Sequence, residues 1–68
     1  MKWEYATIYL FRGIGGSAVL NLPDGSEQKF PGNMTEVTRL LNELGREGWE
    51  IAAWGGESFF TWTLKRAA

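Results

Sequence analysis

The chain has 68 residues, a formal net charge of −1, four tryptophans, and neither histidine nor cysteine. Without cysteine it forms no disulfide, and without cysteine or histidine a structural zinc site is not expected. Seven basic residues against eight acidic ones lack the basic excess of a protein that binds duplex DNA. We therefore expect one domain, residues 1–68, that packs and binds without a cofactor or a metal.

The first expected strand covers Lys2 to Phe11, which is dense in aromatic and β-branched residues. Strand alternation places Ala6, Ile8 and Leu10 on one face, and the other face carries Trp3, Tyr5, Thr7, Tyr9 and Phe11. Because both faces are apolar in the middle, we expect this strand to be central and covered on both sides. A glycine-rich turn over residues 12–17 then leads to a second, antiparallel strand, Ala18 to Leu22.

A turn is predicted at Pro23-Asp24-Gly25-Ser26, because proline presets φ and Asp-Gly tolerates the left-handed region. Glu27 to Phe30 is short and polar, which is typical of an edge strand. Pro31-Gly32 is expected to end it.

A helix from about Met34 to Glu47 is the clearest element of the sequence. Asn33 is a good N-cap, and Glu36 follows at the third helical position, close to a capping box. An apolar stripe at helical spacing consists of Val37, Leu40, Leu41 and Leu44. Gly48 is expected to terminate the helix.

Two strands are expected after the helix, Trp49 to Trp54 and Phe59 to Arg66, joined by a hairpin loop over residues 55–58. In the last strand Phe60, Trp62 and Leu64 share one face, and Phe59, Thr61, Thr63 and Lys65 share the other. The order β-β-β-α-β-β predicts an α+β fold, in which one small, mainly antiparallel sheet of four to five strands packs on a single helix.

One helix cannot cover both faces of such a sheet, so aromatic side chains on the other face need another cover. A chain this short buries only about 60% of the surface that its unfolded form exposes, and its own core is small. We therefore expect a homo-oligomer or a bound partner.

Three stretches, Met1 to Tyr5, Leu41 to Glu50 and Leu64 to Arg66, resemble a family of small prokaryotic and phage proteins catalogued as domain of unknown function 4177. The resemblance implies the strand–helix–strand arrangement and implies no activity. The chain departs from the family in Ala6-Thr7-Ile8-Tyr9 and Ile51-Ala52-Ala53. The segment Gly13 to Phe30 has no counterpart, so a function specific to this chain could lie there.

Three patterns that could carry chemistry have a simpler interpretation. Gly13-Ile14-Gly15-Gly16 could contact an anion, but a strand follows instead of a helix, which favours a hairpin turn. Glu43 and Glu47 share one helix face, where Arg39 and Arg46 are expected to pair with them. The serines, Ser17, Ser26 and Ser58, have no histidine base, and a lysine base (Lys29 or Lys65) is supported by no motif. We therefore expect no enzyme.

The tryptophans carry the functional hypothesis. Trp49 is expected in the core, whereas Trp3, near a chain end, and Trp54, beside a Gly-Gly pair, are expected to be partly exposed. Exposed indoles beside cations can hold a planar anion. The predicted ligand-binding residues are Trp3, Arg12, Gly15, Gly16, Ser17, Trp54, Lys65 and Arg66.

Two functions follow from these residues. The first is a non-enzymatic, oligomeric binding module that sequesters a small planar anion such as a nucleotide signal, as a phage protein could. The alternative is a protein-interaction or assembly module that docks onto another protein, such as a host protein, through its aromatic sheet face or an exposed edge strand. No apolar run reaches the length of about 18 residues that crosses a membrane, and no signal peptide is recognisable, so a cytoplasmic location is expected.

Overall fold

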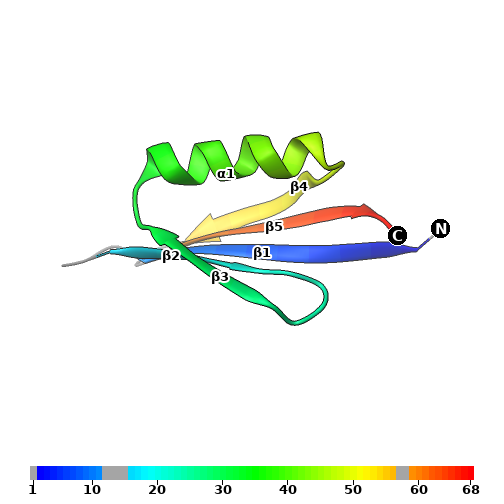
Figure 1. Ribbon diagram of the computed structural model, residues 1–68, viewed down its shortest axis with the longest axis horizontal. Coiled ribbons are helices and arrows are strands. Elements are labelled where there is room, and N and C mark those ends of the chain that lie inside the picture. The colour runs from blue at the N-terminus through cyan, green and yellow to red at the C-terminus, as the bar shows by residue number, and fades with distance from the viewer. Residues whose placement is uncertain (1, 12–15, 57–58) are drawn as a thin grey trace.

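Five strands and one helix follow one another in the predicted order. The computed structural model describes residues 2–11, 16–56 and 59–68 (Figure 1). The elements are β1 (Trp3–Phe11), β2 (Ser17–Asn21), β3 (Glu27–Pro31), α1 (Met34–Arg46), β4 (Glu50–Gly56) and β5 (Phe59–Ala67). The fold is α+β, with one antiparallel sheet and one helix on one side of it, as predicted.

The sheet has the strand order β3-β2-β1-β5-β4, so the first strand of the chain is the middle one. β1 pairs with β5 from Trp3↔Ala67 to Phe11↔Phe59, and with β2 from Thr7↔Asn21 to Phe11↔Ser17. The predicted central position of β1 is confirmed. The predicted cover on both sides is not, because α1 lies over only one face, the one that carries Ala6, Ile8 and Leu10.

The turn between β2 and β3 is the predicted one. The amide of Gly25 donates to the carbonyl of Leu22 at 3.0 Å, which closes a four-residue turn with Gly25 at φ +89°. The Asp24 carboxylate accepts from the amide of Ser26 at 2.9 Å and from its hydroxyl at 2.6 Å. These hydrogen bonds favour the charged form and lower the pKa of Asp24.

Both ends of α1 are capped by local groups. The Asn33 side chain accepts from the amide of Glu36 at 2.9 Å, so the predicted N-cap is confirmed. At the other end Gly48 has φ +92° and donates to the carbonyl of Gly45, while Trp49 donates to that of Leu44, which is a Schellman motif. The helix itself ends at Arg46, one residue before the predicted end, because Glu47 is the C-cap.

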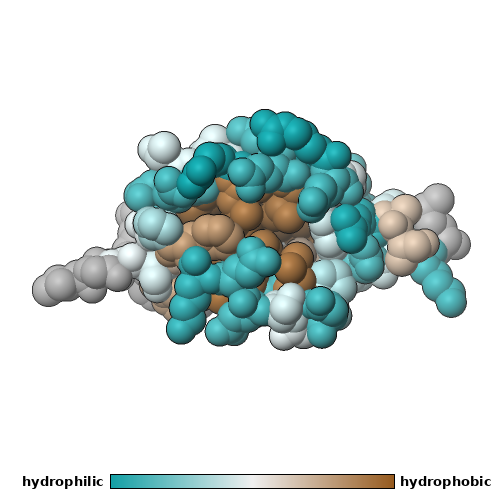
Figure 2. Space-filling view, viewed as in Figure 1, coloured by the Kyte–Doolittle hydropathy of each residue, from teal (hydrophilic) through white to brown (hydrophobic). Residues whose placement is uncertain are grey.

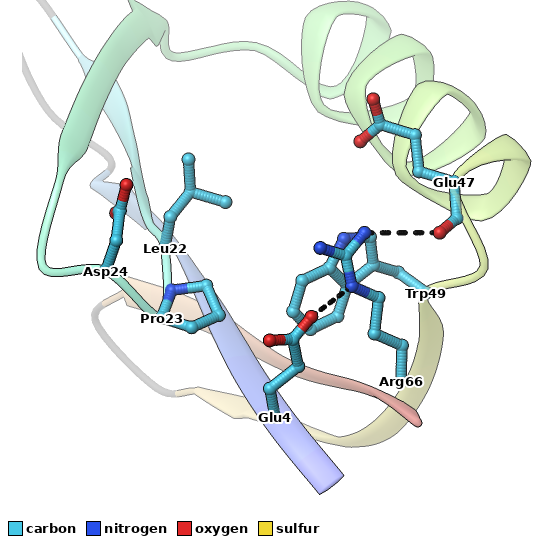
Figure 3. A pocket seen from close by; sticks show the side chains of 7 residues that line it. All are labelled: Glu4, Leu22, Pro23, Asp24, Glu47, Trp49 and Arg66. Carbon is cyan, nitrogen blue, oxygen red and sulfur yellow. Dashed lines mark hydrogen bonds and ion pairs between the residues drawn. The ribbon is translucent and has the colours of Figure 1, made fainter. Parts of the chain in front are cut away.

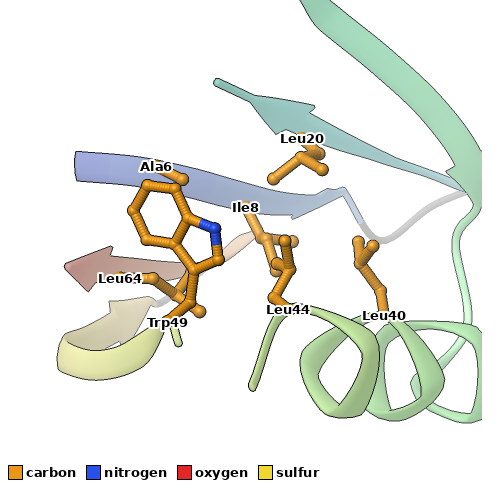
Figure 4. Close-up of a cluster of buried hydrophobic side chains, with 7 residues drawn as sticks. All are labelled: Ala6, Ile8, Leu20, Leu40, Leu44, Trp49 and Leu64. Atoms are coloured by element: carbon orange, nitrogen blue, oxygen red, sulfur yellow. The ribbon is translucent and has the colours of Figure 1, made fainter. Parts of the chain in front are cut away.

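The core lies between α1 and the sheet (Figure 4). Its larger cluster joins the helix to three adjacent strands and consists of Ala6, Ile8, Leu20, Leu40, Leu44, Trp49 and Leu64. Trp49 is only 5% exposed, which confirms the prediction that it is a core residue, although it precedes β4 instead of opening it. A smaller cluster of Leu10, Ala18 and Val37 extends the core toward the start of α1.

The two edges of the sheet differ in composition. β3 carries Glu27, Lys29 and Pro31, the charges and proline that guard an edge against pairing, and it is the predicted edge strand. β4 is mostly exposed, and its register with β5 shifts between Ile51 and Ala53. β4 continues to Gly56, so residues 55 and 56 of the predicted loop belong to the strand instead. Residues 57 and 58 of that loop lie outside the described part of the chain. No helix in the described part is long and apolar enough to span a membrane.

Candidate functional site

The face of the sheet opposite α1, called the open face here, carries a row of aromatic side chains on β1. Trp3 is 42% exposed, Tyr5 53% and Phe11 45%, and the Tyr9 ring stacks near that of Phe11 with 6.3 Å between centroids. Within the described ranges 2–11, 16–56 and 59–68, no helix or strand covers this face. An aromatic row on an uncovered sheet is typical of a docking surface.

Charge on the open face is balanced. Lys29 and Glu27 lie on β3, while Lys65 and Glu50 face each other across β5 and β4 with 3.7 Å between Nζ and Oε1. The Lys65 ammonium also lies 4.5 Å from the centre of the Trp3 ring, a cation–π contact. This balance differs from the basic surface on which single-stranded nucleic acids stack.

On the helix side of the sheet, a cleft separates α1 from the β2–β3 hairpin. Figure 2 shows hydrophobic side chains in the hollow between the polar outer surface of the helix and the hairpin. Its larger cavity has a volume of about 480 Å³ and a smaller one about 140 Å³. The larger cavity is lined by Glu4, Leu22, Pro23, Asp24, Glu47, Trp49 and Arg66. The smaller cavity is lined by Phe30, Glu36, Arg39, Leu40 and Glu43. We call the whole the hairpin cleft.

Arg66 is held at the end of the hairpin cleft by three partners (Figure 3). Its Nε atom donates to Glu4, its Nη1 atom donates to the carbonyl of Glu47 at 3.2 Å, and its guanidinium carbon lies 4.4 Å from the centre of the Trp49 ring. The register explains the ion pair, because Glu4 and Arg66 are direct cross-strand partners on β1 and β5. Two of its five N–H donors are engaged in this way, and its positive charge is already paired with the Glu4 carboxylate.

A third cavity, of about 370 Å³, lies at the other end of the helix side. Met34, Trp54, Phe60 and Trp62 line it, and its walls are almost wholly apolar. Trp54 is 73% exposed and Met34 50%, so the predicted exposure of Trp54 is confirmed, as is that of Trp3.

The predicted ligand-binding residues do not gather in one place. Trp3 and Lys65 are in contact on the open face, whereas Trp54 and Arg66 lie on the helix side, toward opposite ends of the sheet. Ser17 is paired with Phe11, at the far end of β1 from Trp3, and the carbonyl of the adjoining Gly16 accepts from the amide of Gly32 at 3.2 Å. The remaining two, Arg12 and Gly15, lie outside the described residues.

The hairpin cleft was missed by sequence reasoning. Asp24 reads as a turn residue and Glu47 as a helix-surface residue, and each reading is locally correct. Only the strand order brings the hairpin, the start of β1 and the end of α1 together. The available signal in the sequence was the pair of large apolar residues, Leu22 and Phe30, that flank the polar turn and the start of β3, since such side chains need a cover.

Acid–base and metal chemistry find little support among the described residues. They contain no group of three or more carboxylate side chains arranged to hold a metal ion. The expected ion pairs of Glu43 and Glu47 with Arg39 and Arg46 do not form. Arg39 pairs with Glu36 instead, one helical turn earlier, and this raises the pKa of Arg39.

Comparison with known proteins found no matching family model, no matching curated protein and no matching solved structure. The resemblance to domain of unknown function 4177 therefore stays a prediction that rests on its three sequence stretches.

Proposed function

We propose that this protein is a non-enzymatic assembly module that associates with a second copy of itself through the open face. The single observation that carries the proposal is the exposed aromatic row on the central strand. Trp3 and Tyr5 together with Phe11 expose large apolar rings on a surface that no described element covers. Such rings dominate the buried centre of protein interfaces.

The size of the open face supports a second copy as the occupant. β1 has nine residues, so the face is roughly 27 Å long, and five strands spaced at about 4.8 Å make it about 19 Å wide. Each copy would then contribute about 500 Å², and both about 1,000 Å², which is the lower limit for a specific interface. Two lysines and two glutamates leave the face neutral, so like charge does not separate two copies.

Sedimentation velocity over a range of concentrations tests this proposal. We expect the wild type to pass from monomer to dimer at concentrations of tens of micromolar, which corresponds to a free energy of association of roughly −6 kcal/mol. Tyr5→Lys places a charge in the centre of the contact, and we expect it to shift the transition upward at least about tenfold. Trp54→Ser, which removes the most exposed indole on the helix side, is the control and should dimerise like the wild type.

The assembly proposal fails under either of two results. One is a wild type that stays monomeric at the highest concentration reached. The other is a Tyr5→Lys variant that keeps the wild-type circular dichroism spectrum and dimerises equally well.

A second candidate, capture of a planar anion such as a nucleotide, is favoured by one observation. The Trp3 ring and the Lys65 ammonium lie together on the open face, and they supply an aromatic plane and a positive charge. Of the predicted ligand-binding residues, only these two would contribute to such a nucleotide site, because the other described ones lie elsewhere in the fold.

A further inference from the structure

The helix side of the sheet is wider than the helix that covers it. Five strands spaced at about 4.8 Å span roughly 19 Å, whereas a helix with its side chains is about 10–12 Å across. α1 packs over the middle strands, through Leu40 and Leu44 against Ile8 and Leu20. The hairpin cleft is the space left beside it, over β2 and β3 (Figure 2).

Apolar side chains form the floor of this cleft. Leu22 and Phe30 come from the hairpin and are only partly buried, and Trp49 comes from the end of α1. Each packs against the core on one side and lines a cavity on the other. Figure 3 shows Leu22 and Trp49 on opposite sides of the larger cavity.

The rim of the cleft is acidic. Its lining holds five carboxylates and two guanidiniums, which gives a net charge of −3. Both guanidiniums are used within the rim, Arg66 by Glu4 and Arg39 by Glu36. The other three carboxylates, those of Asp24, Glu43 and Glu47, form no ion pair within 4 Å in the described part of the chain, although Glu43 is near enough to Arg39 to contribute to its raised pKa.

We propose that the hairpin cleft binds a basic amphipathic helix of another protein, lying beside α1. Its apolar stripe would rest on the floor formed by Leu22, Phe30 and Trp49. Its lysines or arginines would meet the three rim carboxylates that form no ion pair. The proposal is independent of self-association, because the open face is on the other side of the sheet.

The charge of the rim and the residues of the edge strand β3 favour a basic amphipathic helix over other occupants. An extended peptide would have to pair with β3, which Lys29 and Pro31 guard. A second copy of α1 does not fit either, because it carries two arginines and two glutamates, and its apolar stripe is already buried against the sheet. A helix with an apolar stripe and a positive flank satisfies both the floor and the rim.

The test uses fluorescein-labelled model peptides of about 14 residues, similar in length to α1, and fluorescence anisotropy. The first peptide places leucines at helical spacing and lysines elsewhere. A second replaces every lysine by glutamate, and a third keeps leucine and lysine but scrambles their periodicity. We expect the first to bind at least about tenfold more tightly than either control.

Matched double variants locate the binding. Asp24→Asn with Glu47→Gln removes two carboxylates from the cleft, and Glu27→Gln with Glu50→Gln removes two from the open face. We expect the cleft variant to bind the first peptide about tenfold more weakly and with less salt dependence. The open-face variant should change its affinity less than about twofold.

Several outcomes would overturn the proposal. They are no binding of the first peptide below about 1 mM, equal binding of the glutamate peptide, and an unchanged affinity of the cleft variant. Loss of peptide binding in Tyr5→Lys with wild-type affinity in the cleft variant would instead move the peptide to the open face. A dimer that forms normally while no peptide binds would remove this inference and leave the assembly proposal intact.

Discussion

The four tryptophan side chains differ in how much of their surface neighbouring residues cover. Trp49 is buried beneath Arg66, Trp62 packs beside the core, and Trp3 lies on the open face under Lys65. Trp54 is the most exposed of them and stands on the edge strand β4. One residue type therefore serves as core, as wall and as candidate contact surface. The strand position of each indole decides among these roles.

Asp24 gives a pH-dependent prediction at the residue scale. Hydrogen bonds from Ser26 lower its pKa in the folded state, so its contribution to stability is present above the unfolded pKa. This contribution is lost as the pH falls below about 4. Ser26→Ala removes the hydroxyl donor, and we expect an NMR titration to show the pKa of Asp24 closer to its usual value. Ser17→Ala, at the far end of β2 from this turn, should leave the titration of Asp24 unchanged.

The helix depends on its two ends at the element scale. Its interior buries one stripe, Val37, Leu40 and Leu44, while its ends are closed by the Asn33 side chain and by the backbone around Gly48. The reversal at Gly48 aims the chain back toward the sheet, so Trp49 enters the core and β4 can reach β5. A local backbone conformation thus positions one wall of the hairpin cleft.

Two glycines of this region should respond to alanine in opposite directions. Gly48 has φ +92°, where an alanine Cβ is strained, so Gly48→Ala should lower the free energy of unfolding by about 1 kcal/mol. Gly45 is inside the helix with open space around it, so Gly45→Ala should raise that free energy by about 0.5–1 kcal/mol. Urea denaturation of both variants checks the pair. Equal effects of the same sign would contradict this account of the helix end.

At the scale of the whole molecule, the sheet has more surface than its single helix can cover. One consequence is the open face, which is neutral and aromatic, and the other is the hairpin cleft, which is apolar and acidic. Because the two surfaces lie on opposite sides of the sheet, one molecule could hold a second copy and a different partner at once. A chain of 68 residues buries a small share of its surface by itself, so such contacts would add to its burial.

Nucleotide capture can be tested on the whole molecule by thermal shift. A nucleotide held by Trp3 and Lys65 should raise the melting temperature, since ligand at one hundred times its Kd adds about 2.7 kcal/mol of stability. Lys65→Gln should abolish the shift, whereas Lys29→Gln, on the same face, should retain it. A flat response of the wild type to mono-, di- and cyclic nucleotides would remove this candidate.

Local signals carried much of the prediction. Asn33 and Gly48 bound the helix, and Pro23 to Ser26 form the turn, because each acts through its own backbone and its nearest neighbours. The alternation in β1 correctly separated the core face from the aromatic face. The predicted ligand-binding residues do not form one site, because they were chosen by residue type, whereas a site requires residues that are close together in space.

The sequence by itself determined the kind and order of the elements and the uncovered aromatic face, because periodicity, caps and turns are read from residues close together in the chain. The tertiary structure alone decided which distant residues meet. Arg66 and Glu4 are 62 positions apart and become partners only through the register of β5 on β1. Strand order depends on the burial of whole faces against one helix, and that balance also leaves the hairpin cleft open.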